Sequence, residues 1–447
     1  MRRGASLAGT AVVLLIASWA AAAGPDAEPS KAVAVSDKQA EAAKADFEAG
    51  RELFFQRKYK EAVAKLAAAA KADPTKSSYR LLLAKAHKFA GNSAESTALL
   101  EQILKENPEH VEAAVELGDI LAAAKDWKRI VTTLEPLLKF KHDYPLYHLL
   151  AEAYYQQENL NKARKFYEEA VRLNPRSGDD FYQLANIYLM QNRFAKAAEA
   201  YEKAAALGID TGVLHFKLAS AYFNLRNYLG RVTTAEVLGG AVGRIKDDLY
   251  LVDPVPGRKD TFYVAGPKSA VYQVAKARAM GIDVPQIEFL TANIWLNARR
   301  FAKADAIYKA MEKKVAKADR GLFWFYWAQT ALGLDDYDGY LARLNKAIEA
   351  EPDLYKPTLA DAYITVAARY QQRGDTKKYI AYLEKAVSTN PLSAGLHLTL
   401  GDALWQANRR AEAAERYRLV LELQPDHPQR VRLLNRIRGG AATAGTP

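Results

Sequence analysis

The sequence contains no cysteine among its 447 residues, and it has only seven histidines and four methionines. The absence of cysteine excludes disulfide bonds, thiol nucleophiles, zinc sites with cysteine ligands, haem attached through cysteine and an N-terminal lipoprotein anchor. No two histidines stand four residues apart with a carboxylate beside them, which excludes the helical zinc motif of metalloproteases. Packing of side chains must therefore stabilise the fold.

Motifs for catalysis are absent as well. No glycine-rich loop ends in Lys-Ser or Lys-Thr, and Gly239, Gly240 and Gly243 do not follow a strand of a βαβ unit. No serine occupies a strand-turn-helix elbow, and the many carboxylates are typical of solvated helix faces. We therefore predict a protein that is not an enzyme and that uses no cofactor and no metal.

One uncharged run near the N-terminus has a targeting pattern. Arg2 and Arg3 precede the segment 4–23, which has an apolar centre and ends in three alanines before Gly24. This pattern is typical of a secretory signal peptide over residues 1–23. The alternative is an uncleaved membrane anchor, although the apolar centre is short for a bilayer span. Cleavage would remove two arginines and no acid, leaving +9 of the formal charge of +11.

We accordingly expect a periplasmic or secreted protein with no membrane span after cleavage and no nucleic acid partner. Residues 24–42 are rich in Ala, Pro, Lys and Ser, which predicts a flexible linker.

Beyond this linker the chain repeats itself at a regular interval. The repeated positions stand 34 apart and include Pro74 and Pro108, Ala151, Ala185 and Ala219, Tyr154, Tyr188 and Tyr222, and Pro391 and Pro425. Within one period, apolar residues fall at helical spacing twice, with a polar turn such as 158–161 between the two runs. Each period is therefore predicted to form a pair of α-helices.

This pattern resembles the tetratricopeptide repeat family, whose unit is a 34-residue helical hairpin. The family carries a small residue where the two helices cross. The corresponding positions here are Gly50, Ala84, Gly118, Ala151, Ala185, Ala219, Ala292, Ala328, Ala367 and Gly401. The resemblance implies an all-α fold, a right-handed superhelical solenoid of about ten hairpins.

An insertion divides the array. Ala219 and Ala292 are farther apart than one period, and the excess corresponds to a 39-residue insertion. We therefore expect repeats 1–5 over 43–210, a split sixth repeat over 211–283, and repeats 7–10 over 284–426.

The insertion differs in pattern from the repeats around it. The runs 249–252 and 261–264 flank a Pro-Gly turn and predict a β-hairpin over about 249–264. Tyr250, Phe262 and Tyr263 would form a secondary contact there, and residues 269–280 could supply the second helix of the split repeat. The hairpin is either a decoration that packs on its own solenoid or a contact for a partner or a second copy.

A second stripe of rings and amides follows the first helices of repeats five to eight. In the family this line faces the concave groove, where side-chain amides could hold the backbone of an extended peptide. The predicted partner-binding residues are Tyr182, Asn186, Phe216, Phe223, Asn224, Phe289, Asn293, Asn297, Phe325 and Gln329. The alternative is that the stripe packs on neighbouring repeats.

The C-terminal segment is arginine-rich. Residues 427–438 are predicted to form a basic capping helix whose apolar side consists of Val431, Leu434 and Ile437, followed by a disordered tail over 439–447. Its arginines are either solvated or a contact for an acidic partner or an anionic surface, and the predicted secondary-contact residues among them are Arg430, Arg432 and Arg436.

The resemblance implies an exported scaffold or adaptor that binds a protein or extended peptide in its groove, in envelope assembly, secretion or polysaccharide export. The alternative is a structural subunit of a larger envelope complex, docked through the β-hairpin and the basic C-terminal helix.

Overall fold

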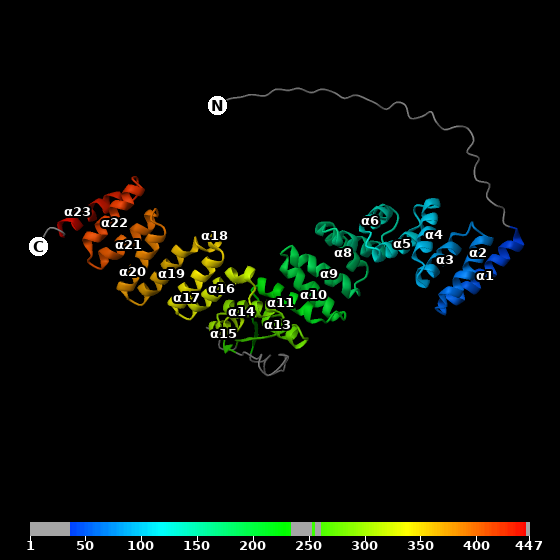
Figure 1. Cartoon of the computed structure of the whole chain (residues 1–447), viewed down its shortest axis with the longest axis horizontal. Helices are drawn as coiled ribbons and strands as arrows, with labels where there is room; N and C mark the ends of the chain where they lie inside the picture. The colour runs from blue at the N-terminus through cyan, green and yellow to red at the C-terminus, as the bar shows by residue number, and fades with distance from the viewer. Residues whose placement is uncertain (1–35, 234–252, 255–260, 444–447) are drawn as a thin grey trace, which may run out of the picture. The chain divides into compact units, whose positions relative to one another are not determined.

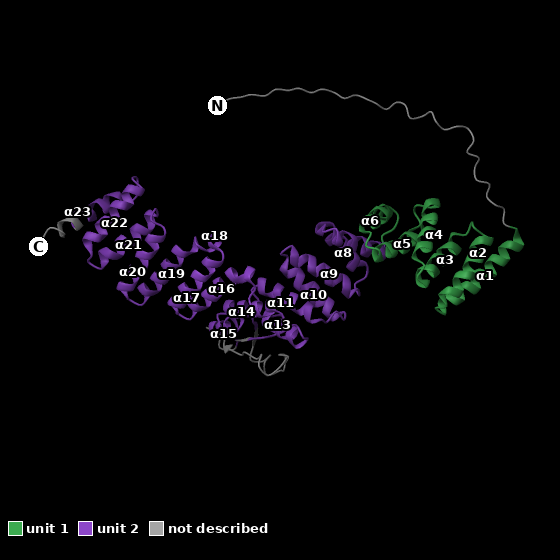
Figure 2. Cartoon of the chain, in the orientation of Figure 1, with its two compact units in different colours: residues 1–142 green, residues 143–447 purple. Residues whose placement is uncertain are grey.

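The computed structural model describes residues 36–233, 253–254 and 261–443 of the chain (Figure 1). The chain divides into two compact units, residues 1–142 and 143–447 (Figure 2). The described part consists mainly of helices, most of them 13 or 14 residues long, joined by short turns. The fold is a solenoid of helix pairs.

Unit 1 contains three helix pairs, α1 with α2, α3 with α4, and α5 with α6. The bounds are α1 Asp37–Phe55, α2 Tyr59–Ala72, α3 Ser77–Ala90, α4 Ser93–Glu106, α5 Val111–Ala123, α6 Trp127–Leu134 and the 3-10 helix η1 Glu135–Lys139. The predicted linker over 24–42 extended too far, because α1 already begins at Asp37. Ser36 forms a capping box with Gln39 there, and this arrangement satisfies backbone N–H groups at the helix start.

Unit 2 begins with α7 Tyr144–Gln156, α8 Leu160–Leu173, α9 Gly178–Met190, α10 Phe194–Ala206, α11 Gly212–Asn224, β1 Gly230–Thr233, β2 Asp253–Pro254, β3 Thr261–Val264 and α13 Ala270–Ala279. It continues with α14 Pro285–Asn297, α15 Phe301–Met311, η2 Lys317–Asp319, α16 Arg320–Gly333, α17 Tyr337–Ala350, α18 Pro352–Tyr355, α19 Thr358–Gln372, α20 Thr376–Thr389, α21 Ala394–Gln406, α22 Arg410–Leu423 and α23 Arg430–Thr443. In the described residues, seven helix pairs stack along this unit.

The turn inside each helix pair contains one residue with a left-handed backbone. Across the described chain these residues are Arg57, Gly91, Lys125, Glu158, Asn192, Arg226, Arg299, Asp335, Gly374 and Asn408. The following N–H donates to the carbonyl five residues earlier, as from Lys58 to Leu53 at 2.9 Å. This is the Schellman pattern, which satisfies the last carbonyls of the first helix.

In nine of the ten helix pairs, all except the one that contains the insertion, the core combines a small and a large residue. The predicted small residue of the first helix is followed sixteen positions later by a leucine or tyrosine that is at most 1% exposed, namely Leu66, Leu100, Leu134, Tyr167, Tyr201, Tyr308, Leu344, Leu383 and Tyr417. A Cβ placed on Gly50 would lie 2.7 Å from Leu66 Cγ, and one placed on Gly401 would lie 2.8 Å from Tyr417 Cε1. These distances agree with the helix crossing predicted at the small residue.

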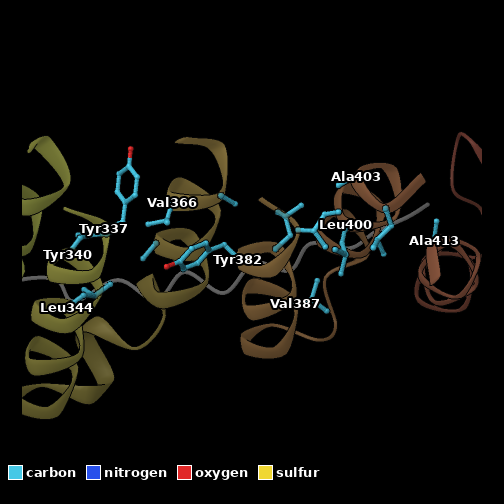
Figure 3. Packing of buried hydrophobic residues seen from close by; sticks show 14 of the residues in the cluster. Tyr337, Tyr340, Leu344, Val366, Tyr382, Val387, Leu400, Ala403 and Ala413 are labelled. Carbon is cyan, nitrogen blue, oxygen red and sulfur yellow. The ribbon is translucent and has the colours of Figure 1, made fainter. Parts of the chain in front are cut away.

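The core is continuous between successive pairs at the C-terminal end of unit 2. One cluster of buried side chains runs from α16 and α17 to α23, and it includes Tyr337, Leu344, Val366, Leu400 and Ala413 (Figure 3). Each repeat therefore buries part of its apolar surface against its neighbour, which is how a solenoid obtains its core.

The insertion leaves the repeat geometry intact. A Cβ on Gly178 of α9 would lie 2.8 Å from Ile209 Cγ1, and a Cβ on Gly212 of α11 would lie 2.7 Å from Ile282 Cγ1. The residues of the second contact are separated in the sequence by the whole insertion, whereas those of the first are not. α13 packs against α11, in agreement with the interpretation of 269–280 as the second helix of the split repeat.

The β-hairpin predicted over 249–264 is not confirmed. Its first strand, with Tyr250, lies outside the described residues, and Asp253–Pro254, predicted as the start of the turn, forms β2. β3 lies between β1 and β2 and pairs antiparallel with both, with Phe262 opposite Val232 in β1. The pairing with β1 was missed because the two strands are far apart in sequence, so no turn motif joins them.

The C-terminal predictions require two corrections. α23 spans Arg430–Thr443, so the helix begins later than 427 and continues into the predicted disordered tail, where alanines follow Gly440. The predicted apolar face was also wrong, because Val431 is 74% exposed whereas Leu433 is completely buried. Residues at a strict spacing of three rotate around a helix of 3.6 residues per turn, and the buried face follows Leu433 and Ile437 instead.

Candidate functional site

An apolar pocket of about 490 Å³ opens on unit 2 where first helices of successive repeats meet. α14 contacts α11 and α16, and the segment between α15 and α16 completes the lining. The lining residues are Phe223, Pro285, Gln286, Phe289, Leu290, Asn293, Met311, Lys314, Val315, Ala316, Asp319, Leu322, Phe323 and Tyr326. Most of them are aromatic or aliphatic, so the pocket can bury apolar surface from a ligand.

The wall at Phe289 is held in place by neighbouring rings. The Phe289 ring lies 6.3 Å from that of Tyr308 on α15 and 5.9 Å from that of Tyr326 on α16, both in edge-to-face geometry. Such pairs contribute about 0.5–1.5 kcal/mol each beyond the area that they bury. The ring position is therefore determined by the packing of three consecutive helices.

Asn293 lies one turn after Phe289 and is only 5% exposed. Its Oδ1 accepts a hydrogen bond from the Tyr308 hydroxyl at 2.8 Å, and its Nδ2 donates to the Phe289 carbonyl at 3.0 Å. Burial raises the pKa of Tyr308, so the hydroxyl stays protonated at neutral pH and keeps donating to Asn293. This bond stiffens the wall of the pocket.

The pocket is open to solvent along the segment before α16. Lys314 and Asp319 in this segment are exposed, and Leu322, which also lines the pocket, is 42% exposed. Charged groups therefore lie at the rim while the rings form the interior. A bulky apolar side chain of a ligand could enter the pocket while the polar backbone of that ligand stays in water.

Two of the predicted binding residues, Tyr182 and Asn186, form a polar cluster between α9 and α11. The Asn186 Oδ1 accepts hydrogen bonds from the Tyr201 hydroxyl at 2.7 Å and from Lys217 Nζ at 2.8 Å. Lys217 Nζ also donates to the Tyr182 hydroxyl at 3.0 Å. Asn186 is 7% exposed, so its amide already serves contacts within the protein.

The other predicted residues are distributed along the same line of first helices. Phe223, Phe289 and Asn293 meet in the apolar pocket. Asn224 and Asn297 are exposed, and each donates from Nδ2 to the carbonyl four residues earlier, on its own helix.

The remaining three residues lie outside the pocket lining. Phe216 is half-buried on α11, and its carbonyl accepts a hydrogen bond from the Ser220 hydroxyl. Phe325 stacks on Tyr355 at a ring separation of 5.2 Å. Gln329 is half-buried on α16. Peptide binding by the predicted amides remains a prediction.

The sequence carries a pattern that predicts hydrogen bonds of Asn186 and Asn293 within their own repeats. Where the large core residue is a tyrosine, its hydroxyl donates to the residue that follows the small one, always fifteen positions earlier. The pairs are Tyr167 with Glu152, Tyr201 with Asn186, Tyr308 with Asn293 and Tyr417 with Asp402. A polar residue after the small one therefore predicts a bond inside its own repeat.

Sequence reasoning also missed Lys217 and most of the pocket wall. Met311, Val315 and Tyr326 come from three different segments, and no local pattern brings them together. The signal for Lys217 is that it is a charged residue on a first helix next to the predicted line of aromatic and amide side chains.

The predicted secondary contacts have different environments. Phe262 and Tyr263 lie in β3. On α23, Arg432 and Arg436 both donate to Asp402 Oδ1, at 2.9 and 2.5 Å, and Arg430 donates to the Pro425 carbonyl. The basic helix is therefore bound to its own repeat through these arginines.

The two lysines of α3, Lys85 and Lys88, have acidic partners. Lys85 lies 2.7 Å from Glu112 and 3.2 Å from Glu116, and Lys88 contacts Glu116 and Asp119 at 2.8 and 2.7 Å. Burial alone would lower the pKa of both lysines, but the hydrogen bonds and negative charges of their acidic partners outweigh it and raise the pKa. These lysines are therefore engaged within the protein.

The described residues contain no group of three or more His, Asp or Glu side chains placed to hold a metal ion. None of their helices combines the length and the apolar character needed to cross a bilayer.

Among solved structures, the chain is similar to MamA (residues 41 to the end) from Desulfovibrio magneticus RS-1, with 23% identity, a TM-score of 0.35, and coverage of 39% of this chain and 97% of that one. It is also similar to PilF from Pseudomonas aeruginosa, with 15% identity, a TM-score of 0.38, and coverage of 42% and 86%. A third similar structure is YrrB, described as a TPR protein with an unusual peptide-binding site, with 14% identity, a TM-score of 0.32, and coverage of 57% and 93%. No curated protein matches the sequence.

Family models provide the assignment. Three models, each described as tetratricopeptide repeat, match residues 144–177, residues 166–199, and residues 90–154 together with 370–437. These matches fall in both compact units. The chain is a tetratricopeptide repeat protein.

Proposed function

We propose that this protein is a scaffold or adaptor that binds a protein partner, and that the apolar pocket around Phe289 receives an apolar side chain of that partner. The observation that supports this proposal is a pocket whose interior consists of rings and aliphatic groups and whose charges lie at the rim. In protein interfaces, an aromatic or aliphatic anchor in such a pocket contributes a large share of the affinity.

The rigidity of the wall supports the same proposal. The rings of Tyr308 and Tyr326 hold Phe289, and Asn293 is bonded on both sides. A pocket that is formed before binding avoids the entropic cost of ordering its side chains. The partner is a protein or an extended peptide, bound along the first helices on the concave face of a right-handed superhelix.

We further propose that the protein acts outside the cytoplasm, in the periplasm or after secretion, during envelope assembly, secretion or polysaccharide export. The support is the signal-peptide pattern of residues 1–23. N-terminal sequencing of the protein from fractionated cells should give a start close to Gly24 in the soluble envelope fraction. An intact Met1 chain in the membrane fraction would contradict this proposal.

The pocket can be tested by photo-crosslinking in cells. Leu322 lines the pocket and is 42% exposed, whereas Leu354 on α18 is 58% exposed and is not part of the lining. A photoreactive phenylalanine analogue at 322 should give a discrete adduct with a partner protein, and the same group at 354 should not. The Phe289→Ala substitution should reduce the adduct at 322. Equal adducts at both positions, or none at 322, would refute the pocket as a binding site.

A further inference from the structure

Among the described residues, Lys217 on α11 has no acidic partner. Its Nζ donates to the Tyr182 hydroxyl at 3.0 Å and to Asn186 Oδ1 at 2.8 Å, and it lies 4.9 Å from the centre of the Tyr182 ring. All three contacts are neutral. Within the described part of the chain, no carboxylate oxygen lies within 4.0 Å of this nitrogen. Lys85 and Lys88 of unit 1, by contrast, each contact two carboxylates.

The surroundings of Lys217 favour an external anion. The side chain is half-buried, so its charge is less screened by water than that of a fully exposed lysine. The two hydrogen bonds hold the ammonium group in one position between α9 and α11. A carboxylate that reached it would form a charge-assisted hydrogen bond, which is about twice as strong as a neutral one.

Lys217 and the pocket residue Phe223 both lie on α11, one on the side of α9 and the other on the side of α14. Lys217 contacts α9, whereas Phe223 lines the pocket next to α14. Ser220 lies between them, and its hydroxyl is bonded to the Phe216 carbonyl. Six residues of α-helix separate Lys217 from Phe223, which corresponds to about 9 Å along the axis at about 1.5 Å per residue.

We propose that the pocket and Lys217 form one two-part site, which binds a partner segment with a carboxylate at least three residues from its bulky apolar anchor. This proposal rests on the proposed function of the pocket. At about 3.3 Å per residue in an extended chain, three residues cover the axial distance alone. Six residues of α-helix also place Lys217 and Phe223 about 120° apart around α11, so three is the smallest number of residues that can separate the carboxylate from the anchor. The apolar side chain enters the pocket while the carboxylate pairs with the Lys217 ammonium group.

The test uses fluorescein-labelled peptides in a Gly-Ser background, each with one tryptophan and one glutamate at separations of one to six residues in either order. A matched set replaces the glutamate with glutamine. Fluorescence anisotropy with the purified chain at low salt should show a glutamate preference of roughly five- to tenfold at separations of three or more residues, and no preference at a separation of one. Substituting glycine for tryptophan should abolish binding.

Three variants and one control variant separate the two parts of the site. Lys217→Gln should remove the glutamate preference, and Lys217→Arg should retain it. Lys203→Gln is the matched control, because Lys203 lies over the Phe181 ring at 5.4 Å on α10, away from the pocket, and it should behave as the unaltered protein does. Phe289→Ala should weaken glutamate and glutamine peptides alike.

Two results would refute different statements. The two-part site would be refuted if the affinities for glutamate and glutamine peptides were equal at every separation, or if Lys217→Gln left their ratio unchanged. In either case, binding that still depends on tryptophan would continue to support the pocket. Binding that does not depend on tryptophan would overturn both the pocket and the proposal built on it.

Discussion

The crossing of α9 and α10 allows the repeat geometry to be tested with one substitution. Ala185 has no exposed surface, and it precedes by sixteen positions the fully buried Tyr201. In the last repeat, where the equivalent residues are Gly401 and Tyr417, a Cβ placed on Gly401 would lie only 2.8 Å from Tyr417 Cε1. Ala185→Leu would place an isobutyl group into this crossing.

The expected cost has two parts. Overpacking of a dense core costs about 1–3 kcal/mol. Displacing the Tyr201 ring would also lengthen its 2.7 Å hydrogen bond to Asn186, and a lost bond of this kind costs about 0.5–1.5 kcal/mol. We therefore expect Ala185→Leu to lower the free energy of unfolding by roughly 2–4 kcal/mol.

Urea unfolding followed by circular dichroism measures this change, and hydrogen exchange of peptides from α9 and α10 locates it, because repeat arrays can unfold in parts. Ala206→Leu is the control, since Ala206 is exposed on α10 and should change stability by less than about 0.5 kcal/mol. If Ala185→Leu left both the unfolding midpoint and the exchange of α9 unchanged, the assigned crossing would be wrong.

Three further substitutions test local features. Burial would raise the pKa of Asp180, but the hydrogen bond and the charge of a histidine on α7 outweigh it and lower this pKa below its ordinary 3.8. The stabilisation by the ionised Asp180 is therefore present above about pH 4 and is lost as the pH falls further. The difference in urea midpoint between the unaltered protein and Asp180→Asn should shrink from pH 5.5 to pH 3. Glu106→Gln removes the carboxylate that accepts hydrogen bonds from Nη1 and Nη2 of Arg80, whose side chain is 7% exposed. It should destabilise α3 and α4 by about 1–3 kcal/mol, measured as faster hydrogen exchange. Leu433→Ala should cost about 2 kcal/mol or more in thermal unfolding of the C-terminal repeat, whereas Val431→Ala should cost little because Val431 is 74% exposed.

The helix pairs could be predicted because their determinants are local. The regular period, the small residue in each first helix and the polar turns are all visible in the sequence, and the structure contains a helix pair at each of the ten positions among its described residues. The spacing of Ala219 and Ala292 predicted a 39-residue insertion in the sixth repeat. In the structure, Gly212 meets Ile282 as Gly178 meets Ile209.

The site could be predicted only in part. Helical spacing placed Phe223, Phe289 and Asn293 on one line, and in the structure these three residues line one pocket. The same reasoning treated Asn186 as available for a peptide, although Tyr201 and Lys217 already donate to it. Spacing along one helix shows which residues share a face, but it does not show which neighbouring helix supplies their partners.

The sequence by itself determined the fold unit, because a helix pair depends on periodicity, turn residues and a small residue within a single period. Tertiary structure decided the pocket, the neutral surroundings of Lys217, the pairing of β1 with β3 and the buried face of α23. These features depend on contacts between segments that are distant in the chain. Such contacts form only when successive repeats stack, and the angle of that stacking is not encoded in any local pattern.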